Sequence, residues 1–326
     1  MTAREHGRRM DGRGRLALGL TALALTLLWL RRPHAVGMSV ARGLQLCVRT
    51  MIPSLFPFMV LSELLVSSGL CRRLVRPLGR LLRPLLGVSE SGAGAWLMGM
   101  LCGFPVGARV AASLYRSGEM DESEFCHVIC FCNVPSTAFL VSAVGASMLG
   151  EPRLGWCLVG TTLGACVLVG ALLRLYGKRG SAHTLTHRTM PHEPRRSAGE
   201  MIGAAISSAA TAMLQVCATV VIFCALIGTL TQYADACGVP PAWRAVVFGL
   251  LELSTGASAA ASLGERTTAA VLCAAVAGWG GLSVHCQILS VCDGCPVPLG
   301  RFFLSRAWQA LLSGAGMALI LHSGMI

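Results

Sequence analysis

Gly103-Phe-Pro-Val-Gly-Ala-Arg109 interrupts an apolar segment at residues 93–114, and Asn133-Val-Pro-Ser-Thr137 interrupts the next one, at residues 125–149. Proline removes a backbone donor and breaks a helix, and glycine lets two backbones approach closely. In hydrocarbon such a break persists only where protein or a water-filled cavity covers the freed N–H and C=O groups. The two stretches therefore predict discontinuous helices within a membrane protein.

The second half of the chain follows the same order. Glu252-Leu-Ser-Thr-Gly256 interrupts residues 245–263, and Gly278-Trp-Gly-Gly-Leu-Ser283 interrupts residues 267–291. Residues 107–114 and 256–263 are also identical at six of eight positions. Alanine-rich strings match easily by chance, but together with the shared order they predict two internal repeats.

Composition agrees with a membrane protein. Of 326 residues, 54% are hydrophobic and 13% are charged, against roughly 25% charged in soluble domains. This excludes a disordered chain and disfavours a soluble enzyme. We predict an all-α polytopic membrane protein with an extra N-terminal transmembrane helix at residues 16–30 and a surface helix at residues 36–50. Further spans are expected at residues 51–70, 154–176, 204–233 and 302–322.

The net charge of +12 is distributed as a topology signal. Arginines cluster before residue 16, at residues 71–88 and in the polar loop at residues 177–200. The positive-inside rule then makes all three segments cytoplasmic, and no nucleic-acid partner is expected. If one broken segment of the first half is re-entrant, that half crosses the membrane an odd number of times, and the second repeat is inverted.

These elements define four regions. Residues 1–35 carry the basic N-terminus and first transmembrane helix, residues 36–176 the first repeat, residues 177–200 the cytoplasmic loop and residues 201–326 the second repeat.

Several motifs resemble those of one family. They are Met51-Ile-Pro-Ser-Leu-Phe-Pro-Phe, Leu61-Ser-Glu-Leu, Gly103-Phe-Pro-Val-Gly-Ala, Asn133-Val-Pro-Ser, Leu251-Glu-Leu-Ser-Thr-Gly and Gly278-Trp-Gly-Gly-Leu-Ser-Val-His-Cys-Gln. Their order resembles the YlbJ-type sporulation integral membrane proteins, which carry the nucleoside-recognition, or Gate, domain. The resemblance implies a multi-pass protein of the bacterial cytoplasmic (inner) membrane, needed for spore formation, with a looser kinship to concentrative nucleoside transporters. The sequence departs from the family's pattern at Phe104, where tyrosine is frequent in the family, and at Cys286, where alanine is common.

Ionisable residues within the apolar segments are the first candidates for a site. Glu252, followed by Ser254 and Thr255, must gain a partner, a proton or a cavity, because a carboxylate is costly in hydrocarbon. Glu63 either binds a ligand, reaches the interface or pairs with an arginine of residues 71–88. Arg109 is an anchor for an anion or a substrate carboxyl group, a partner for Glu252, or an arginine that snorkels to the interface.

Neutral polar side chains at two other breaks complete the candidate site. They are Asn133, Ser136 and Thr137 in the first half, and Ser283, His285 and Gln287 in the second. Such groups suit a small polar solute, nucleoside-like by resemblance only, with a possible coupling cation. The alternative is that they merely satisfy the broken backbone. We expect Glu252, Asn133, Ser136, Ser283, His285 and Gln287 to face one mid-membrane cavity.

Three functions are compatible with these features. A solute transporter or permease is favoured, and a non-transporting membrane scaffold is the alternative. An intramembrane hydrolase using Ser283 and His285 is remote, because these residues are near neighbours in sequence without an orienting acid, so no enzyme activity is expected. The fifteen cysteines lie mostly in apolar segments, where thiols act as small hydrophobes. No metal site and no cofactor are predicted.

The topology can be tested by labelling. In a variant without native cysteines, Ser181→Cys is expected to resist an impermeant thiol reagent in intact cells and to react after permeabilisation, because the basic loop should be cytoplasmic. Reaction in intact cells would contradict both this topology and the inverted repeat.

Overall fold

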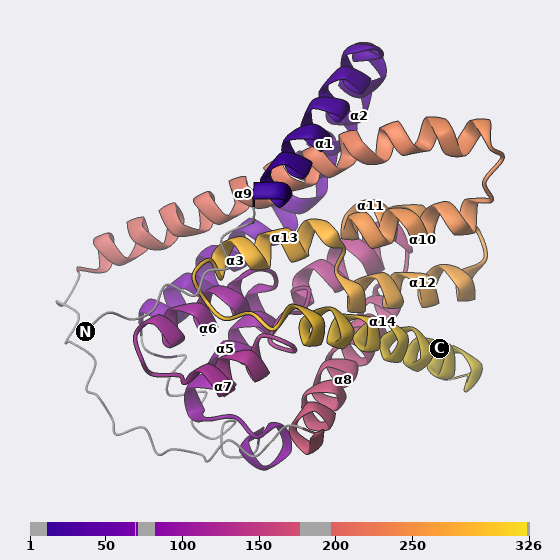
Figure 1. The fold of residues 1–326 in the computed structure, drawn as a ribbon. Coiled ribbons are helices and arrows are strands. Elements are labelled where there is room, and N and C mark those ends of the chain that lie inside the picture. The colour runs from indigo at the N-terminus through magenta and orange to yellow at the C-terminus, as the bar shows by residue number, and fades with distance from the viewer. Residues whose placement is uncertain (1–11, 69, 71–81, 177–196, 325–326) are drawn as a thin grey trace.

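The computed structural model describes residues 12–68, 70, 82–176 and 197–324, and every regular element in those ranges is a helix (Figure 1). The basic segment before residue 12, most of residues 71–88 and most of the loop at residues 177–200 lie outside the described residues. Their cytoplasmic placement therefore stays a prediction.

The chain begins with α1 (Gly12–Leu30). Three consecutive helical segments follow it: α2 (Pro33–Leu46), a π-helical turn η1 (Cys47–Met51) and α3 (Ile52–Ser67). Residues 36–50, expected to lie on the membrane surface, form α2 and η1, and α2 packs along α9 (Ala198–Ala236). With α3 they form a pair bent by 52°, which has the composition of one broken span.

Two short helices and one broken helix follow. The helices α5 (Glu90–Cys102) and α6 (Val106–Arg116) pack against each other as a hairpin. Next, α7 (Glu122–Val128) ends in a non-helical stretch at residues 129–136, and the chain resumes as a π-helix, η2 (Phe139–Met148). The long helix α8 (Pro152–Tyr176) completes this half.

The second half has the same order of structural elements: a long helix, a helical hairpin, a broken helix and a closing helix. The helix α9 has 39 residues, about 58 Å at 1.5 Å per residue, which exceeds the roughly 30 Å of a bilayer core. A hairpin follows, made by α10 (Pro241–Leu251) and α11 (Leu253–Ala261). The broken pair α12 (Arg266–Trp279) and α13 (Leu282–Val291) leads to the closing helix α14 (Leu299–His322).

Helices that occupy corresponding places in the two halves pack on each other. Long α9 lies against α2 and α3 along one side of the molecule, as Figure 1 shows, and α8 packs against α14. Helix α14 also packs along α12, so it contacts both halves.

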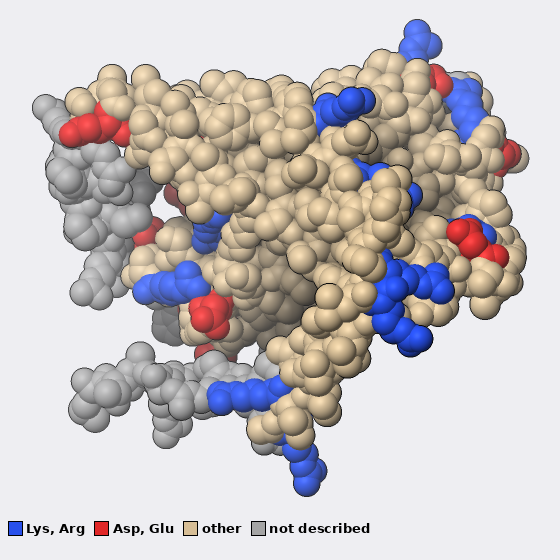
Figure 2. All heavy atoms as spheres, turned by 90° about the horizontal axis from the view of Figure 1, so that it is seen from above, with Lys and Arg blue, Asp and Glu red and all other residues tan. Residues whose placement is uncertain are grey.

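Four described helical segments are long and apolar enough to cross a membrane: α1, α8, α9 and the α12–α13 pair. The bent pair made by α2, η1 and α3 is a fifth if it counts as one span. Helix α14 is not among them, although we expected residues 302–322 to span. The face in Figure 2 has large uncharged areas between few charged side chains, and apolar side chains such as Leu214 and Ile222 of α9 are exposed. The chain is thus built as a membrane protein.

Glycine ends the helices at two of the four breaks and lets backbones touch near the hairpin tips. Gly103 stops α5 at φ +78°, and Gly280 stops α12 at φ +90°. In the first hairpin a Cβ on Gly99 would overlap the carbonyl oxygen of Cys132, and in the second a Cβ on Gly256 would overlap the backbone of Gly249. Gly107 meets the same carbonyl oxygen of Cys132, so Gly99 and Gly107 form a packing surface of the first hairpin.

We expect Gly99→Ala to lower the free energy of unfolding by about 1–3 kcal/mol, the usual cost of an overpacked contact. The matched control is Gly160→Ala in α8, where an added Cβ meets no atom within 4 Å and better helix propensity should stabilise slightly. Thermal unfolding of both purified variants measures the difference. Equal stability of the two variants would contradict the packing described.

Candidate functional site

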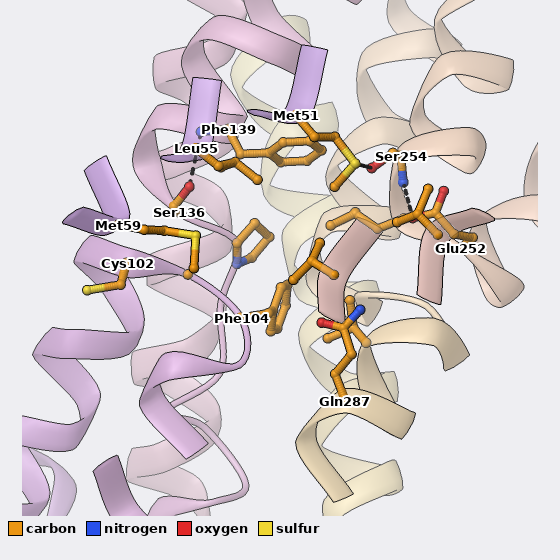
Figure 3. Close-up of a pocket in the computed structure, with 16 residues that line it drawn as sticks. Met51, Leu55, Met59, Cys102, Phe104, Ser136, Phe139, Glu252, Ser254 and Gln287 are labelled. Atoms are coloured by element: carbon orange, nitrogen blue, oxygen red, sulfur yellow. Dashed lines mark hydrogen bonds between the residues drawn. The ribbon is translucent and has the colours of Figure 1, made fainter. Parts of the chain in front are cut away.

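The tips of the broken helices surround one cavity between the two halves of the chain (Figure 3). Figure 3 shows Ser136 and Phe139 on one side and Glu252 and Ser254 on the other, with Phe104 between them. The cavity volume is about 40 Å³, room for a few water molecules. Sixteen residues line it, and most of them are apolar. They are Met51, Leu55, Met59, Cys102, Gly103, Phe104, Pro135, Ser136, Phe139, Val216, Val220, Glu252, Leu253, Ser254, Val284 and Gln287.

Glu252 supplies the only acidic or basic side chain among the sixteen lining residues other than the thiol of Cys102. It is 1% exposed and forms the one-residue break between α10 and α11. Its Oε1 accepts from the backbone N–H of Ser254 at 2.9 Å, and its Oε2 accepts from that of Thr255 at 2.6 Å. The carboxylate thus caps the positive end of α11, and no salt bridge to it is found among the described residues.

Glu265 has the same capping geometry in a different environment. It accepts from the N–H groups of Thr267 and Thr268 at the start of α12, at 3.0 and 2.7 Å, and is exposed. Hydrogen bonds from the Thr268 hydroxyl and backbone lower the pKa of the Glu265 carboxyl. The chain therefore contains a solvent-exposed counterpart of the buried Glu252 cap.

The first-half break is held by donors that the sequence analysis did not single out. Ser305 Oγ donates to the carbonyl of Cys130 at 2.8 Å, and Gln309 Nε2 donates to the same oxygen at 2.9 Å. Both side chains project from α14 and are buried. Polar residues at positions 305, 306 and 309 in the predicted closing span were the available signal, because helix positions three or four apart share one face.

Arg306, on the same face of α14, joins the breaks of the two halves. Its Nη1 donates to Asn133 O at 2.5 Å and to Gln309 Oε1 at 2.7 Å, and its Nε donates to Trp279 O at 3.1 Å. Nη2 has no hydrogen-bond partner. The guanidinium lies over the ring of Phe104, 5.4 Å from its centroid, and is 1% exposed.

The remaining predicted site residues divide into two groups. Ser136 and Gln287 line the cavity together with Glu252 and Ser254. Asn133, Ser283 and His285 are buried beside the breaks but do not line it. Each of these three has a side-chain atom without a partner: Asn133 Oδ1, Ser283 Oγ and His285 Nδ1.

Other candidates lie away from the cavity lining or contribute backbone. Thr255 donates its backbone N–H to the Glu252 carboxylate, and its hydroxyl lies 3.4 Å from Cys224 Sγ. Glu63, on α3, accepts from Ser208 Oγ of α9 at 2.9 Å. Thr137 and Arg109 are half-buried and do not line the cavity.

The cysteines near the first-half break donate to backbone carbonyls. Cys126 Sγ lies 3.0 Å from Pro296 O, and Cys166 Sγ lies 2.6 Å from Phe131 O. The fourteen cysteines at described positions are free thiols, and no group of three metal-ligating side chains occurs in the same part of the chain.

Comparison with known proteins agrees with this architecture. Residues 48–152 match the Gate family, described as nucleoside recognition. The sporulation integral membrane protein YlbJ of Bacillus subtilis (strain 168) is 24% identical over 328 residues, covering 91% of this chain and 80% of that protein. The resemblance inferred from the motifs is confirmed.

Among solved structures, a doubly substituted CNTnw in an outward-facing state superposes with a TM-score of 0.55 and 15% identity, covering 97% of this chain and 89% of that one. The fold is thus similar to that of a concentrative nucleoside transporter. A bacterial integral membrane protein is supported.

We expect Arg306→Met to lower the free energy of unfolding by on the order of 3 kcal/mol, because the buried acceptors Asn133 O and Gln309 Oε1 lose this donor and each costs about 1–3 kcal/mol. Trp279 O keeps His285 Nε2, 3.0 Å away. The control is Arg301→Met on the exposed face of the same helix, which should change stability by less than about 0.5 kcal/mol. Thermal unfolding and abundance in the membrane are the measurements. A stable, abundant Arg306→Met protein would contradict the bridging role.

Proposed function

We propose that this chain is a transporter of a small polar solute, acting in the cytoplasmic membrane during spore formation. The observation that carries the proposal is Glu252, a fully buried carboxylate at a helix break that lines a cavity and has no basic partner among the described residues. Ionisable groups at mid-membrane are costly and mark solute or ion pathways.

The chemistry of the lining fits such a solute. Glu252 uses one lone pair of each oxygen to cap α11, and a carboxylate has about four acceptor sites. The remaining sites can accept from a solute hydroxyl or amine, or bind a coupling cation or proton. Ser136 and Gln287 add neutral hydrogen-bonding groups beside mostly apolar walls, the composition common in small-molecule sites.

We further propose that the two halves are inverted repeats, which would support alternating access. Each half has a long helix or bent pair, a hairpin, a broken helix and a closing helix, and the corresponding helices α8 and α14 pack together. Rocking of one repeat against the other about a fixed midplane site is the usual transport motion of such folds. A solute larger than a few waters requires the halves to move apart.

We expect Glu252→Gln to abolish complementation of a sporulation defect while leaving the protein abundant in the membrane. The amide keeps the size of the side chain but removes its charge and two of its acceptor sites. Glu265→Gln, which alters the exposed cap of the same type, should complement normally. The number of heat-resistant spores measures complementation, and immunodetection measures the amount of protein in the membrane of the same cells.

Normal sporulation with Glu252→Gln at normal abundance would exclude a required carboxylate. Loss of the protein with Glu252→Gln but not with Glu265→Gln would instead favour the scaffold, in which the breaks only shape helix packing.

A further inference from the structure

We infer that Arg306 provides an anion subsite behind Phe104, so that the solute carries a carboxylate or phosphate group at one end. This inference rests on the proposed solute-transport function. It concerns Nη2 of Arg306 and the adjoining atoms of Phe104 and Gly280.

The charge of Arg306 is not neutralised by the described part of the chain. Its guanidinium contacts three neutral oxygens, from Asn133, Trp279 and Gln309. Only two salt bridges occur among the described residues, Arg244–Asp235 and Arg266–Glu151, and neither involves it. A buried charge without a counter-charge is strongly disfavoured. An anion bound at Nη2 would remove that penalty, and a neutral ligand or a water would not.

The unused hydrogen-bonding capacity of Arg306 lies on one nitrogen. Nη1 and Nε are occupied, whereas Nη2 is buried and has no partner. A Cβ placed on Gly280 would lie 3.1 Å from Nη2 and 3.2 Å from the tip of the Phe104 ring. The neighbours of Nη2 on this side are therefore a glycine without a side chain and the edge of one aromatic ring.

Phe104 connects this nitrogen to the cavity. Its ring lines the cavity on one side and lies under the guanidinium on the other, as Figure 3 shows for the cavity side. Phe104 is half-buried. The proposed subsite therefore requires the Phe104 ring to rotate, so that an anionic oxygen in the cavity can reach Nη2.

Glu252 lies at the opposite end of the same short path. A Cβ on Gly281 would lie 2.9 Å from Leu253 N and 3.1 Å from Glu252 Cα, so the Gly280–Gly281 dipeptide separates Arg306 from the Glu252 break. A solute lying along this dipeptide would have its anionic group at Arg306 and its hydroxyl or amine groups at Glu252. Opposite charges held apart in this way orient a polar solute.

The test uses the purified full-length protein in lipid nanodiscs and compares matched compounds. Orotate differs from uracil by a carboxylate, and uridine 5′-monophosphate differs from uridine by a phosphate. Thermal unfolding is followed as each compound is titrated at low millimolar concentration, where general salt stabilisation is small. We expect a saturable rise in the unfolding temperature with the anionic member of at least one pair and a smaller effect with its neutral partner. Equal effects within both pairs, or no effect of any of the four compounds, would overturn the subsite.

Variants assign the binding to Arg306. Arg306→Lys keeps the charge but loses the planar fork, and we expect it to weaken binding of the anionic compound about tenfold or more. Arg301→Lys on the exposed face of α14 should bind as the unaltered protein does. Unchanged anion binding by a folded Arg306→Lys protein would overturn the assignment. If Arg306→Lys does not fold, Phe104→Trp is tested in its stead. A larger ring between the cavity and Nη2 should weaken binding of the anionic compound, and an unchanged affinity for that compound would exclude access to Nη2 past residue 104.

Failure of this subsite and failure of the proposed function give different results. If Glu252→Gln abolishes sporulation while the paired compounds act alike on the unaltered protein, transport stands and the anion subsite is wrong. If the anion binds through Arg306 but Glu252→Gln sporulates normally, the subsite stands and the role proposed for Glu252 is wrong.

Discussion

The structure depends on the way α14 satisfies the carbonyl groups that the first-half break sets free. Ser305, Arg306 and Gln309 project from one face of that helix and donate to Cys130 O and Asn133 O. In an environment without water these carbonyls have few other donors, and each unsatisfied group costs several kcal/mol. The broken helix of one half is therefore stable only because the last helix of the other half packs against it.

The same interaction connects the two breaks. Arg306 also donates to Trp279 O, the carbonyl of the residue that ends α12, so a single guanidinium binds the non-helical stretch of the first half and the end of α12 in the second. The hairpin tips complete the arrangement through glycine contacts such as Gly99 against Cys132. A cavity remains where four backbone breaks meet, and most of its wall is apolar.

Glu252 and Arg306 are both buried, yet they are not paired with each other. Each is held by backbone groups, the carboxylate by two N–H groups of α11 and the guanidinium by two carbonyls. Such dipoles stabilise charge less completely than an ion pair would. Residues that cost stability in this way while lining or adjoining a cavity are typical of functional sites.

The sequence alone determined where the helices stop. Gly, Pro and a lone carboxylate inside apolar segments have local physical consequences, and the helices end at all four predicted breaks. It also determined that Glu252 needs a partner, a proton or a cavity, because a carboxylate is costly in hydrocarbon whatever the fold. The tertiary structure decided which groups contact Glu252 and the backbone at the other breaks. The polar face of the closing helix marked Arg306 as unusual in an apolar segment, but its backbone partners lie 27 and 173 residues away, and only packing of α14 across both halves brings them together. The same packing separated Asn133, Ser283 and His285 from the cavity lining, because a side chain's direction at a break is set by its neighbours in space, not by its position in the motif.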